Sequence, residues 1–518
     1  MSAKLFLFQD EARLKLQEGL RKLALLISPT LGPKGNHVAL DNAAGSAKIT
    51  SDSSAILEEV EFKDQFENFT VELVRKMAEE IKAQTGDGVA TGIVILNALM
   101  QEALKHLAAG ASPAGLKKEI ENELDKALNK LSSLAVRIKT EKEIEKIALS
   151  AGGSIEIGQL LSEALKKAGE GGLVSIEEGR GLKSTLELAR GFEIDRGYLS
   201  PYFCTNLEKL TVEMENPYFL ITDKKLASVQ ELLPVLQNLN AIGGALIIIA
   251  EEIEGDALAT LVINKLKGIL KVAAIKAPSF GEERKQLLED LACLTGARVV
   301  AEETGGSLVK TTLEDLGRAE KVFIGKETTN VINGQGAKDL LEKRILQLEK
   351  QNDLEEGEYE KDKLKKRIAR LKGNAAVIKV GAASETELKQ KKALFEESLA
   401  AVRAALEEGV AAGGGLAFVR AAQALDKTSF GGRILQKALL APMETLLKNS
   451  SQESALYLEK IQKRDDLFGY NLETEKFEDL FQAGVLDPVK VLKNSLKKAA
   501  STAILMLFSE VLIGEDKS

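Results

Sequence analysis

Both ends of the chain repeat apolar residues at the spacing of amphipathic helices. Residues 9–28 predict one such helix, which stops at the loop containing Pro29. The runs 67–83 and 89–107 predict two more, because turn-forming residues separate them. The run 489–508 repeats the pattern near the other end. Apolar positions of the first and last helices are Leu14, Leu16, Leu20, Leu23 and Ile27, and Val491, Leu492, Leu496, Ala499, Ala503, Ile504 and Leu507.

Residues 191–378 have a different pattern, in which short β-rich runs alternate with helical ones. This alternation predicts an α/β domain in the middle of the chain. Within it, residues 338–372 are dense in Glu and Lys and predict two solvated helices packed as a hairpin. The predicted strands are 218–223, 245–252 and 271–278.

Two stretches that flank the middle, 133–190 and 376–407, are poor in β-forming residues. Each is too short to enclose a core of its own. We therefore expect the two stretches to pair with each other as a connecting domain.

The composition is that of a folded, soluble protein with several domains. The chain has 518 residues, of which 44% are hydrophobic and 29% are charged, so it is too long for a single core. Its net charge of -8 leaves no basic stripe for phosphate backbones, which excludes nucleic acid as an expected partner. Because the first residues lack signal-peptide features and no apolar run reaches membrane-spanning length, we expect a cytoplasmic protein that does not bind membranes.

Cysteine and histidine are too scarce to support most catalytic chemistries. Cys204 and Cys293 stand far apart without metal-ligand spacing, so we expect two buried free thiols. The chain has 2 His residues, which leaves little material for imidazole triads or metal clusters. Any catalysis is therefore expected to use carboxylates and a bound metal.

Glycine-rich loops supply the candidate chemistry. The loop 30–35 (TLGPKG) allows backbone amides to approach an anion, although most such loops are only turns. Asp87 lies between Gly86 and Gly88 at the start of a predicted helix, where it could hold Mg²⁺ beside a phosphate or simply act as the N-cap. The triplet 413–415 (GGG) indicates either close backbone approach or a helix C-cap.

The predicted helix 256–268 carries an unusually wide apolar face. Its apolar residues cover an arc of roughly 200°, whereas one buried face needs roughly 100°. Part of the face is therefore expected to meet a partner, and burial on two sides is the alternative. The residues of this face are Leu258, Leu261, Val262, Ile263 and Leu266.

Motifs along the whole chain resemble those of the group I chaperonins, the GroEL family. The resemblance implies a mainly α subunit with α/β parts, in which both chain ends build a helical equatorial domain, the flanks a small intermediate domain and the middle an apical domain. It also implies rings, hinge motions driven by ATP and a co-chaperonin lid that closes the cavity. The motifs are TLGPKG (30–35), GDG (86–88), RGYLSPYF (196–203), IKAPSFG (275–281), TTLEDLG (311–317), VIKVGAAS (377–384), EEGVAAGGG (407–415) and LDPVKV (486–491). The implied boundaries are 1–132 with 408–518 (equatorial), 133–190 with 376–407 (intermediate) and 191–375 (apical).

The resemblance also assigns residues to roles. Asp52 and Glu397 would be catalytic, Asp87 would hold Mg²⁺, and K⁺ is a further cation that the family admits. Nucleotide contacts would come from Thr30, Leu31, Gly32, Pro33, Asp87, Gly88, Val89, Ala90, Thr91, Gly414, Asn471 and Asp487. Non-native polypeptide would bind Tyr198, Tyr202, Phe203, Leu233, Leu236, Leu258, Val262 and Ile263.

The chain departs from the family pattern at several of these positions. The family reads GDGTTT where this chain has Val89 and Ala90 after the GDG motif, so two hydroxyl groups directed at phosphate are missing. Ser51 and Ser53 flank Asp52 in place of Lys and Gly, Glu397 replaces a catalytic Asp, and the family's Asn-Ala-Ala reads Asn471-Leu472-Glu473. The missing hydroxyl groups predict weak nucleotide binding. Because a misplaced carboxylate can cost about a hundredfold in rate, we also predict that turnover is slow or absent.

Two other functions compete with an ATP-dependent foldase. A binding protein with weak or no ATPase activity, acting as a holdase or interaction scaffold, is favoured by Val89, Ala90, Ser51 and Glu473. A small-molecule kinase would also use glycine loops, but no phosphoacceptor site accompanies them in the sequence.

Overall fold

A computed structural model describes residues 4–41, 48–138, 140–151, 154–169, 173–179, 181–207, 210–301, 305–355, 357–464 and 467–515. The chain divides into two compact units, Met1–Ser162 with Lys389–Ser518 and Glu163–Leu388. Both boundaries fall inside the predicted intermediate domain, within helices α7 (Ile155–Ala168) and α13 (Glu385–Glu408). The predicted division into three domains stays a prediction.

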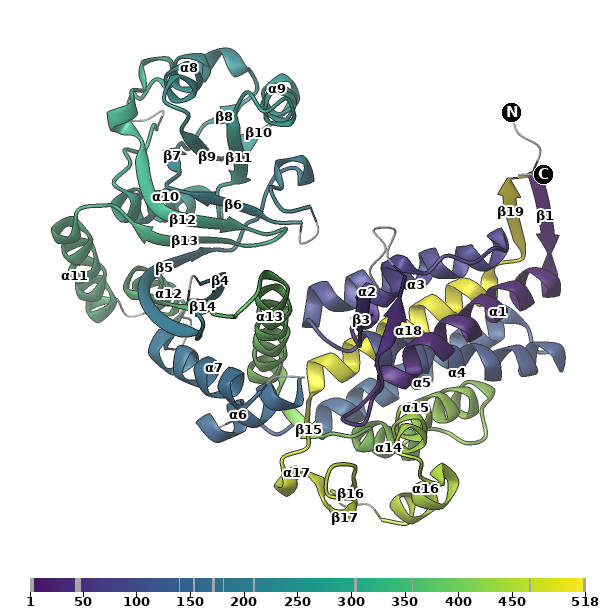
Figure 1. Cartoon of the computed structure of the whole chain (residues 1–518). Helices are drawn as coiled ribbons and strands as arrows, with labels where there is room; N and C mark the ends of the chain where they lie inside the picture. The colour runs from purple at the N-terminus through teal and green to yellow at the C-terminus, as the bar shows by residue number, and fades with distance from the viewer. Residues whose placement is uncertain are drawn as a thin grey trace. The chain divides into compact units, whose positions relative to one another are not determined.

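The first unit is a helical bundle built from both chain ends. In Figure 1, α18 runs beside α3 and α4, which come from the opposite end of the chain. Its helices are α1 (Gln9–Ile27), α2 (Ser53–Glu59), α3 (Gln65–Thr85), α4 (Val89–Ala108), α5 (Pro113–Ser133), α6 (Glu141–Ser150), α14 (Leu416–Gln423), α15 (Phe430–Asn449), α16 (Ser454–Gln462), α17 (Leu480–Ala483) and α18 (Val489–Phe508). These bounds confirm the four helices predicted from periodicity.

Pairs of short strands complete this unit. Strands β1 (Lys4–Phe8) and β19 (Val511–Glu515) pair antiparallel, so the two ends of the described chain form one ribbon. The other antiparallel pairs are β2 (Val38–Leu40) with β3 (Lys48–Thr50), β15 (Val410–Ala412) with β18 (Leu486–Pro488) and β16 (Phe468–Asn471) with β17 (Lys476–Asp479).

The core of the bundle forms where α1, α3, α4, α15 and α18 pack together. On α1 the predicted apolar face is buried at Leu16, Leu20, Leu23 and Ile27, whereas Leu14 is exposed and was predicted wrongly. Gly19 lets α1 approach α3, because a Cβ there would lie 2.8 Å from the Glu67 carbonyl oxygen.

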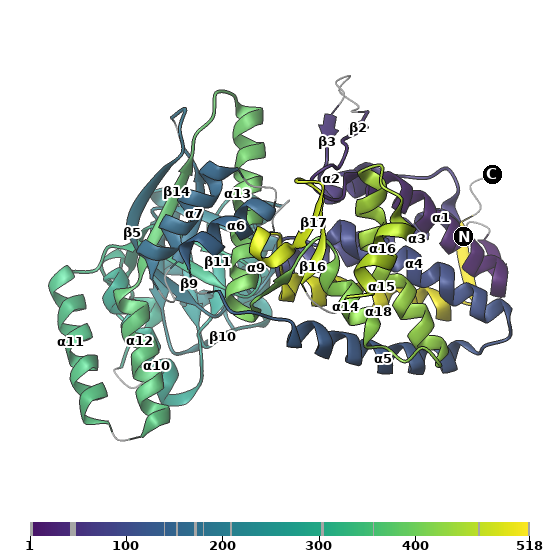
Figure 2. The ribbon, with the colours of Figure 1, turned by 90° about the horizontal axis from the view of Figure 1, so that it is seen from below.

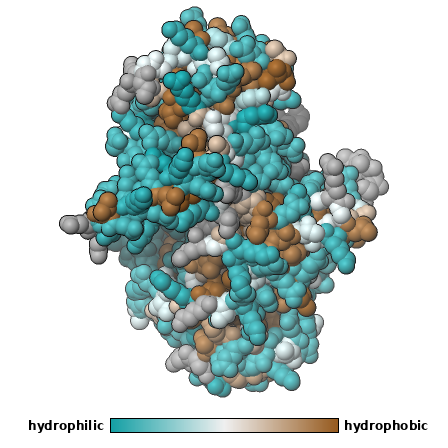
Figure 3. All heavy atoms as spheres, turned by 90° about the vertical axis from the view of Figure 1, so that its left-hand side faces the viewer, coloured by the Kyte–Doolittle hydropathy of each residue, from teal (hydrophilic) through white to brown (hydrophobic). Residues whose placement is uncertain are grey.

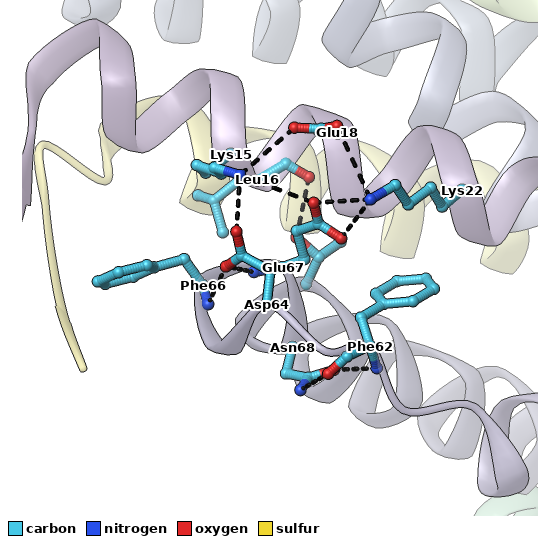
Figure 4. Close-up of polar contacts among 10 residues, drawn as sticks. Lys15, Leu16, Glu18, Lys22, Phe62, Asp64, Phe66, Glu67 and Asn68 are labelled. Carbon is cyan, nitrogen blue, oxygen red and sulfur yellow. Dashed lines mark hydrogen bonds and ion pairs between the residues drawn. The ribbon is translucent and has the colours of Figure 1, made fainter. Parts of the chain in front are cut away.

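Ion pairs fasten α1 to the start of α3, as Figure 4 shows. Lys15 Nζ lies 2.6 Å from Asp64 Oδ2, and Lys22 Nζ lies 2.7 Å from the buried Glu67 carboxylate. Asp64 also caps α3 by accepting a hydrogen bond from the Phe66 N–H at 2.8 Å. The buried Glu67 is thus paired, as a carboxylate in a core must be.

The second unit is built on a mixed sheet. Its strand order is β11-β9-β7-β12-β13-β5-β14-β4, and β6 also pairs with β12. Strands β8 and β10 pair with each other as a separate two-stranded sheet. The strands are β4 (Leu173–Glu178), β5 (Thr185–Ile194), β6 (Val212–Glu215), β7 (Tyr218–Ile221), β8 (Lys225–Leu226), β9 (Ala245–Ala250), β10 (Glu252–Ile253), β11 (Lys271–Lys276), β12 (Gly317–Ile324), β13 (Thr329–Gly334) and β14 (Asn374–Val380). The predicted strands β7, β9 and β11 are confirmed; they are adjacent and parallel, with buried aliphatic side chains.

Helices and short 3₁₀ turns surround this sheet. The helices are α8 (Leu233–Ala241), α9 (Gly255–Leu266), α10 (Gly281–Thr295), α11 (Lys338–Leu354) and α12 (Glu358–Lys372), and the 3₁₀ turns used below are η2 (Pro201–Phe203) and η3 (Val229–Glu231). Figure 2 shows α11 and α12 side by side, which confirms the predicted hairpin. Asp290 of α10 fixes both of them, because its buried carboxylate pairs with Arg344 at 2.9 Å and with Arg367 at 2.7 Å.

The expectation that the flanking stretches are poor in strands was wrong. Strands β4, β5 and β14 lie in or across them, and β4 pairs with β14 in parallel, Val174 opposite Ala376. The two flanks therefore do pair, but as the edge of the large sheet. Short strands that contain charged residues have a weak sequence signal, and pairing between distant segments stabilises them.

Two further expectations were tested by the fold. Cys204 is buried as predicted, but Cys293 is only half-buried, and both thiols are free. Among the described helices, none combines the length and apolar character needed to cross a membrane.

Candidate nucleotide site

The loop 30–35 is held in place by its neighbours in the first unit. Asn449 of α15 donates hydrogen bonds to the carbonyl oxygens of Ser28 and Leu31, at 2.8 and 2.9 Å. Gly32 has φ +89°, and a Cβ there would lie 2.2 Å from Leu446 Cδ2, so glycine is required on two grounds. The loop that carries Thr30, Leu31, Gly32 and Pro33 therefore has a defined conformation.

The turn at 86–88 joins α3 to α4 and depends on both glycines. Gly86 has φ 71° and Gly88 has φ 101°. A Cβ at Gly88 would lie 2.2 Å from Ser495 Oγ of α18, whose hydroxyl donates to the Gly88 carbonyl oxygen at 2.9 Å. The turn is thus locked against α18, and substituting Gly88 would require it to move.

Asp87 is not the N-cap of α4, which settles the alternative raised by the sequence. The cap position is Gly88, and Asp87 Oδ1 accepts a hydrogen bond from the Gly88 N–H at 2.6 Å. Because Gly88 has no side chain to cap the helix, the first N–H groups of α4 are left for another acceptor. Val89, Ala90 and Thr91 form this first turn. Such a helix start, with a carboxylate beside it, suits a phosphate and its metal ion.

Asp52 and Glu397 converge on a lysine that sequence reasoning missed. Lys82 Nζ lies 3.5 Å from Asp52 Oδ2 and 3.7 Å from Glu397 Oε1. The other oxygen of Asp52 caps α2 by accepting from the Ser54 N–H at 2.8 Å. The available signal was the position of Lys82 in the last turn of α3, directly before the loop that carries Asp87.

Burial, and after it the charge of neighbouring carboxylates, raises the pKa of three carboxyl groups in this site. Burial raises the pKa of Glu397 to about 7, the nearby carboxylates of Asp52 and Asp87 add to the effect, and Lys82 opposes it. Burial, with Asp87 nearby, raises the pKa of Asp487 to about 7. The side chain of Asp87 reaches solvent, yet the surrounding protein atoms desolvate its carboxyl group and so raise its pKa. The charge of Asp52 also raises this pKa, whereas the hydrogen bond from the Gly88 N–H lowers it. The site thus has surplus negative charge, which a divalent cation would relieve.

This surplus predicts a pH-dependent stability change in Glu397→Gln. Because the folded pKa of about 7 lies above the ordinary glutamate pKa of 4.5, the cost of the charge is absent below pH 4.5 and grows until pH 7. Partial exposure reduces the effect, so we expect the variant to be more stable than the unmodified protein by about 1 kcal/mol at pH 8. Near pH 5 the two proteins should melt alike. Thermal unfolding without nucleotide, with Glu396→Gln as control, measures this, and a gain that does not change with pH would contradict it.

The triplet 413–415 is a site of close approach, and the alternative of a helix C-cap was wrong. It follows β15 and precedes α14, with Gly415 as the N-cap of α14. A Cβ at Gly413 would lie 2.9 Å from the carboxyl carbon of Asp487. Gly414 has φ +62°. The backbone before Gly414 therefore lies directly against Asp487, which keeps these two predicted nucleotide contacts together.

Asn471 is placed differently from the expectation. Its buried amide donates to Glu478 Oε1 at 2.8 Å, and its oxygen accepts from the Glu473 N–H at 2.9 Å. These bonds hold the turn between β16 and β17, so the amide is occupied within the protein. Leu472 is also buried, so the larger side chain at this position is absorbed by the core. An ion pair between Lys34 and Glu475 connects this turn to the loop 30–35.

The predicted polypeptide-binding residues separate into exposed and buried sets. Tyr202, Leu233 and Ile263 are 62%, 42% and 49% exposed, and Tyr198, Leu258 and Val262 are half-buried. Phe203 and Leu236 lie in the core of the second unit, so the prediction that they meet a partner is not supported. The turn η2 directs Tyr202 outward and Phe203 inward, and Leu236 shares the buried face of α8 with Val235 and Leu239.

Helix α9 has one buried face rather than two. Ala257 and Leu261 are buried, whereas Ile263 and Leu266 are exposed. Helix α9 contacts η2 and η3, and α8, which begins at Leu233, also contacts η3. The exposed apolar residues of α8, α9 and η2 therefore gather in one region of the second unit, which we call the α9 surface (Tyr202, Leu233, Ile263 and Leu266). Apolar exposure is not confined to this region, because the face drawn in Figure 3 has separate hydrophobic areas within a mostly hydrophilic surface.

Comparison with known proteins places this geometry in context. The profile of the TCP-1/cpn60 chaperonin family matches residues 23–517. The chain is 43% identical to Chaperonin GroEL 3 of Protochlamydia amoebophila (strain UWE25) over 519 residues, which covers 99% of this chain and 97% of the relative. Among solved structures, it is similar to the chaperonin gp146 from the bacteriophage EL 2 (Pseudomonas aeruginosa), crystallised in the presence of ATP-BeFx. That likeness has a TM-score of 0.73 and 20% identity, with 99% of this chain and 100% of the other covered.

Proposed function

Because this chain belongs to the TCP-1/cpn60 chaperonin family, we propose that it is an ATP-dependent chaperonin that captures non-native proteins on the α9 surface. The predicted fold class, a mainly α chaperonin subunit with α/β parts, is confirmed by the family match and by the fold. The proposal depends most on one observation. Asp52 and Glu397 both lie within 4 Å of Lys82, which is in the last turn of α3, and α3 leads into the turn that carries Asp87.

The residues of the site fit a magnesium nucleotide. Mg²⁺ is usually held by one or two carboxylates together with substrate phosphates, and when bound it neutralises charge on the transferred phosphoryl group. In the described ranges no cluster of three or more His, Cys, Asp and Glu side chains is arranged to hold a metal alone. Asp87 beside the start of α4 is therefore the candidate ligand, with phosphate completing the site. K⁺ stays an expectation from the family resemblance.

The remaining residues of the site would position water and substrate. The N–H groups of the first turn of α4 would bind phosphate oxygens. Asp52 and Glu397 would orient the attacking water, and the pKa of Glu397, about 7, lets its carboxylate accept a proton near neutral pH. Asp487 of β18, which lies against the Gly413 backbone, would contact the nucleotide from the pair of strands β15 and β18.

Self-association in rings is part of the proposal and has support in the first unit. The ribbon of β1 and β19 leaves Leu5, Phe6, Phe8, Val511 and Ile513 exposed. A short ribbon with open edges and exposed apolar side chains favours contact with another chain. A co-chaperonin lid belongs to the same proposal through the family resemblance.

ATP hydrolysis and refolding of a denatured protein, both measured on the same preparation of purified protein, test the proposal. We expect the purified protein to form an assembly of ring mass, to hydrolyse ATP in a Mg²⁺-dependent reaction and to refold a denatured test protein only when ATP is present. Capture of that protein without turnover would instead favour the holdase. Because the family favours an ATP-dependent chaperonin, we expect slow turnover rather than none.

Restoring one missing hydroxyl should tighten nucleotide binding. Ala90 is half-buried in the first turn of α4, so Ala90→Thr adds a hydroxyl where the phosphate is expected. One hydrogen bond is worth about 1 kcal/mol, so the KM for ATP should fall about fivefold with little change in kcat. Val89 is unsuitable because its side chain is part of the core. An unchanged KM in steady-state kinetics would contradict this placement of the phosphate.

A further inference from the structure

Lys82 is the cation of a site otherwise dominated by carboxylates. It is the basic residue in the last turn of α3, and its ammonium lies within 4 Å of both Asp52 and Glu397, at 3.5 and 3.7 Å. The carboxylates come from different segments of the first unit, one at the start of α2 and one within α13. A single ammonium therefore connects the two residues that would position the attacking water.

The backbone of Lys82 connects it to the loop that carries Asp87. The Gly86 N–H donates to the Lys82 carbonyl oxygen at 2.8 Å. Gly86 in turn packs against α13, since a Cβ there would lie 2.3 Å from the Cβ of Ala400. The end of α3, the Asp87 turn and the part of α13 near Glu397 thus form one packed corner. A shift of Lys82 would therefore change the ion pairs of both Asp52 and Glu397.

Lys82 differs from the lysine of an isolated surface ion pair, because its ammonium contacts two carboxylates from different segments. Exposed pairs contribute little to stability, and the Lys82 side chain is 42% exposed. However, Asp52 Oδ1 is already fixed by the Ser54 N–H, so the contact of Oδ2 with Lys82 sets the remaining orientation of the carboxylate. Both ammonium contacts are longer than the ~2.8 Å of close charge-assisted bonds. The ammonium has three donors, so it can serve both carboxylates at once.

We propose that Lys82 is a positioning residue for ATP hydrolysis, which acts by holding Asp52 and Glu397 in one orientation beside the Asp87 turn. This inference rests on the proposed function of the site. Two carboxylates directed at one water repel each other, and a cation between them offsets that repulsion. When nucleotide adds further negative charge, the same cation limits the cost.

Steady-state ATP hydrolysis by Lys82→Ala tests the proposal in the full-length assembly. We expect kcat to fall about thirtyfold, because misplaced catalytic groups cost between ten- and a hundredfold, while KM changes less than about threefold. Lys82→Arg keeps a cation in reach and should recover most of the loss. Lys76→Ala changes an exposed lysine on the same helix and should leave kcat unchanged.

Chemical rescue separates positioning from general structural damage. Lys82→Ala removes a propylammonium-sized group from a partly exposed place, so added propylammonium should restore kcat in a saturable way. Tetramethylammonium has the same charge but no N–H donor and should not restore it. A kcat within threefold of that of the unmodified protein, or a loss that neither arginine nor propylammonium recovers, would overturn the proposal.

A thermal unfolding cycle keeps the inference testable if the protein has no turnover. In that case the proposed function fails, but Lys82→Met, Glu397→Gln and the double variant still report the pairing. We expect the melting-temperature shift caused by Lys82→Met to be smaller in the Glu397→Gln background. Additive shifts would show that Lys82 does not hold Glu397.

Discussion

Asp87→Asn is expected to lower ATP turnover by about a thousandfold, because loss of metal-assisted charge neutralisation costs several kcal/mol in the transition state. Asparagine has nearly the same shape, and its side-chain oxygen can still accept the hydrogen bond that Asp87 Oδ1 accepts from the Gly88 N–H. The turn should therefore keep its conformation while the amide fails to match the charge of Mg²⁺. Steady-state hydrolysis and nucleotide binding at increasing Mg²⁺ concentrations measure the effect.

Stability distinguishes this loss from unfolding. Crowding by protein and the charge of Asp52 raise the pKa of Asp87, so a neutral amide should not destabilise the nucleotide-free protein. We expect an unchanged or higher melting temperature at pH 8. Asp125→Asn, an exposed carboxylate on α5, serves as the control. If Asp87→Asn retained the Mg²⁺ dependence of the unmodified protein, Asp87 would not be the metal ligand.

The double variant Leu233→Ser and Ile263→Ser is expected to lose capture of a denatured test protein by about a hundredfold, because each buried apolar side chain contributes about 1.5 kcal/mol to such a contact. Both side chains are roughly half exposed, so neither substitution opens a cavity in the core. Non-native chains share unburied apolar surface rather than sequence, and binding should follow the apolar area that meets them. Co-sedimentation with a chemically denatured protein, before ATP is added, gives the affinity.

A control variant tests whether loss of any exposed leucine reduces capture of the denatured protein. Leu340→Ser changes a leucine of α11 that is 58% exposed but lies outside the α9 surface. Capture should be unaffected in this variant, and ATP hydrolysis should be unaffected in both. Equal loss of capture in the two proteins would show that the α9 surface has no special role.

The sequence predicted those parts of the fold that local pattern determines. Helices α1, α3, α4 and α18 and strands β7, β9 and β11 have regular apolar patterns over their lengths, and the structure confirms them. Strands β4, β5 and β14 were missed because long-range pairing, not local composition, stabilises them. Periodicity also could not tell that Leu14 lies outside the core, since the helix buries only the stripe that meets α3 and α4.

The candidate site was predictable only as far as motifs mark it. The glycines of the Asp87 turn and of 413–415 are visible in sequence because their backbone conformation and close packing demand them. Lys82 was missed, because its place in the last turn of α3 does not reveal that the carboxylates of Asp52 and Glu397 lie beside it. The burial of Phe203 and Leu236 could not be predicted, because an apolar residue on a short turn or helix has the same identity whether it faces inward or outward.

Because β1 pairs with β19 at the other end of the chain, the first unit cannot finish folding until synthesis on the ribosome is nearly complete. The second unit is one continuous stretch, Glu163–Leu388, whereas the first needs both Met1–Ser162 and Lys389–Ser518. The N-terminal helices must therefore wait, with their apolar faces uncovered, until α18 and β19 have been synthesised. Although domains usually fold from the N-terminus onward, the second unit, which is synthesised after the N-terminal helices, can complete its fold before the first unit does.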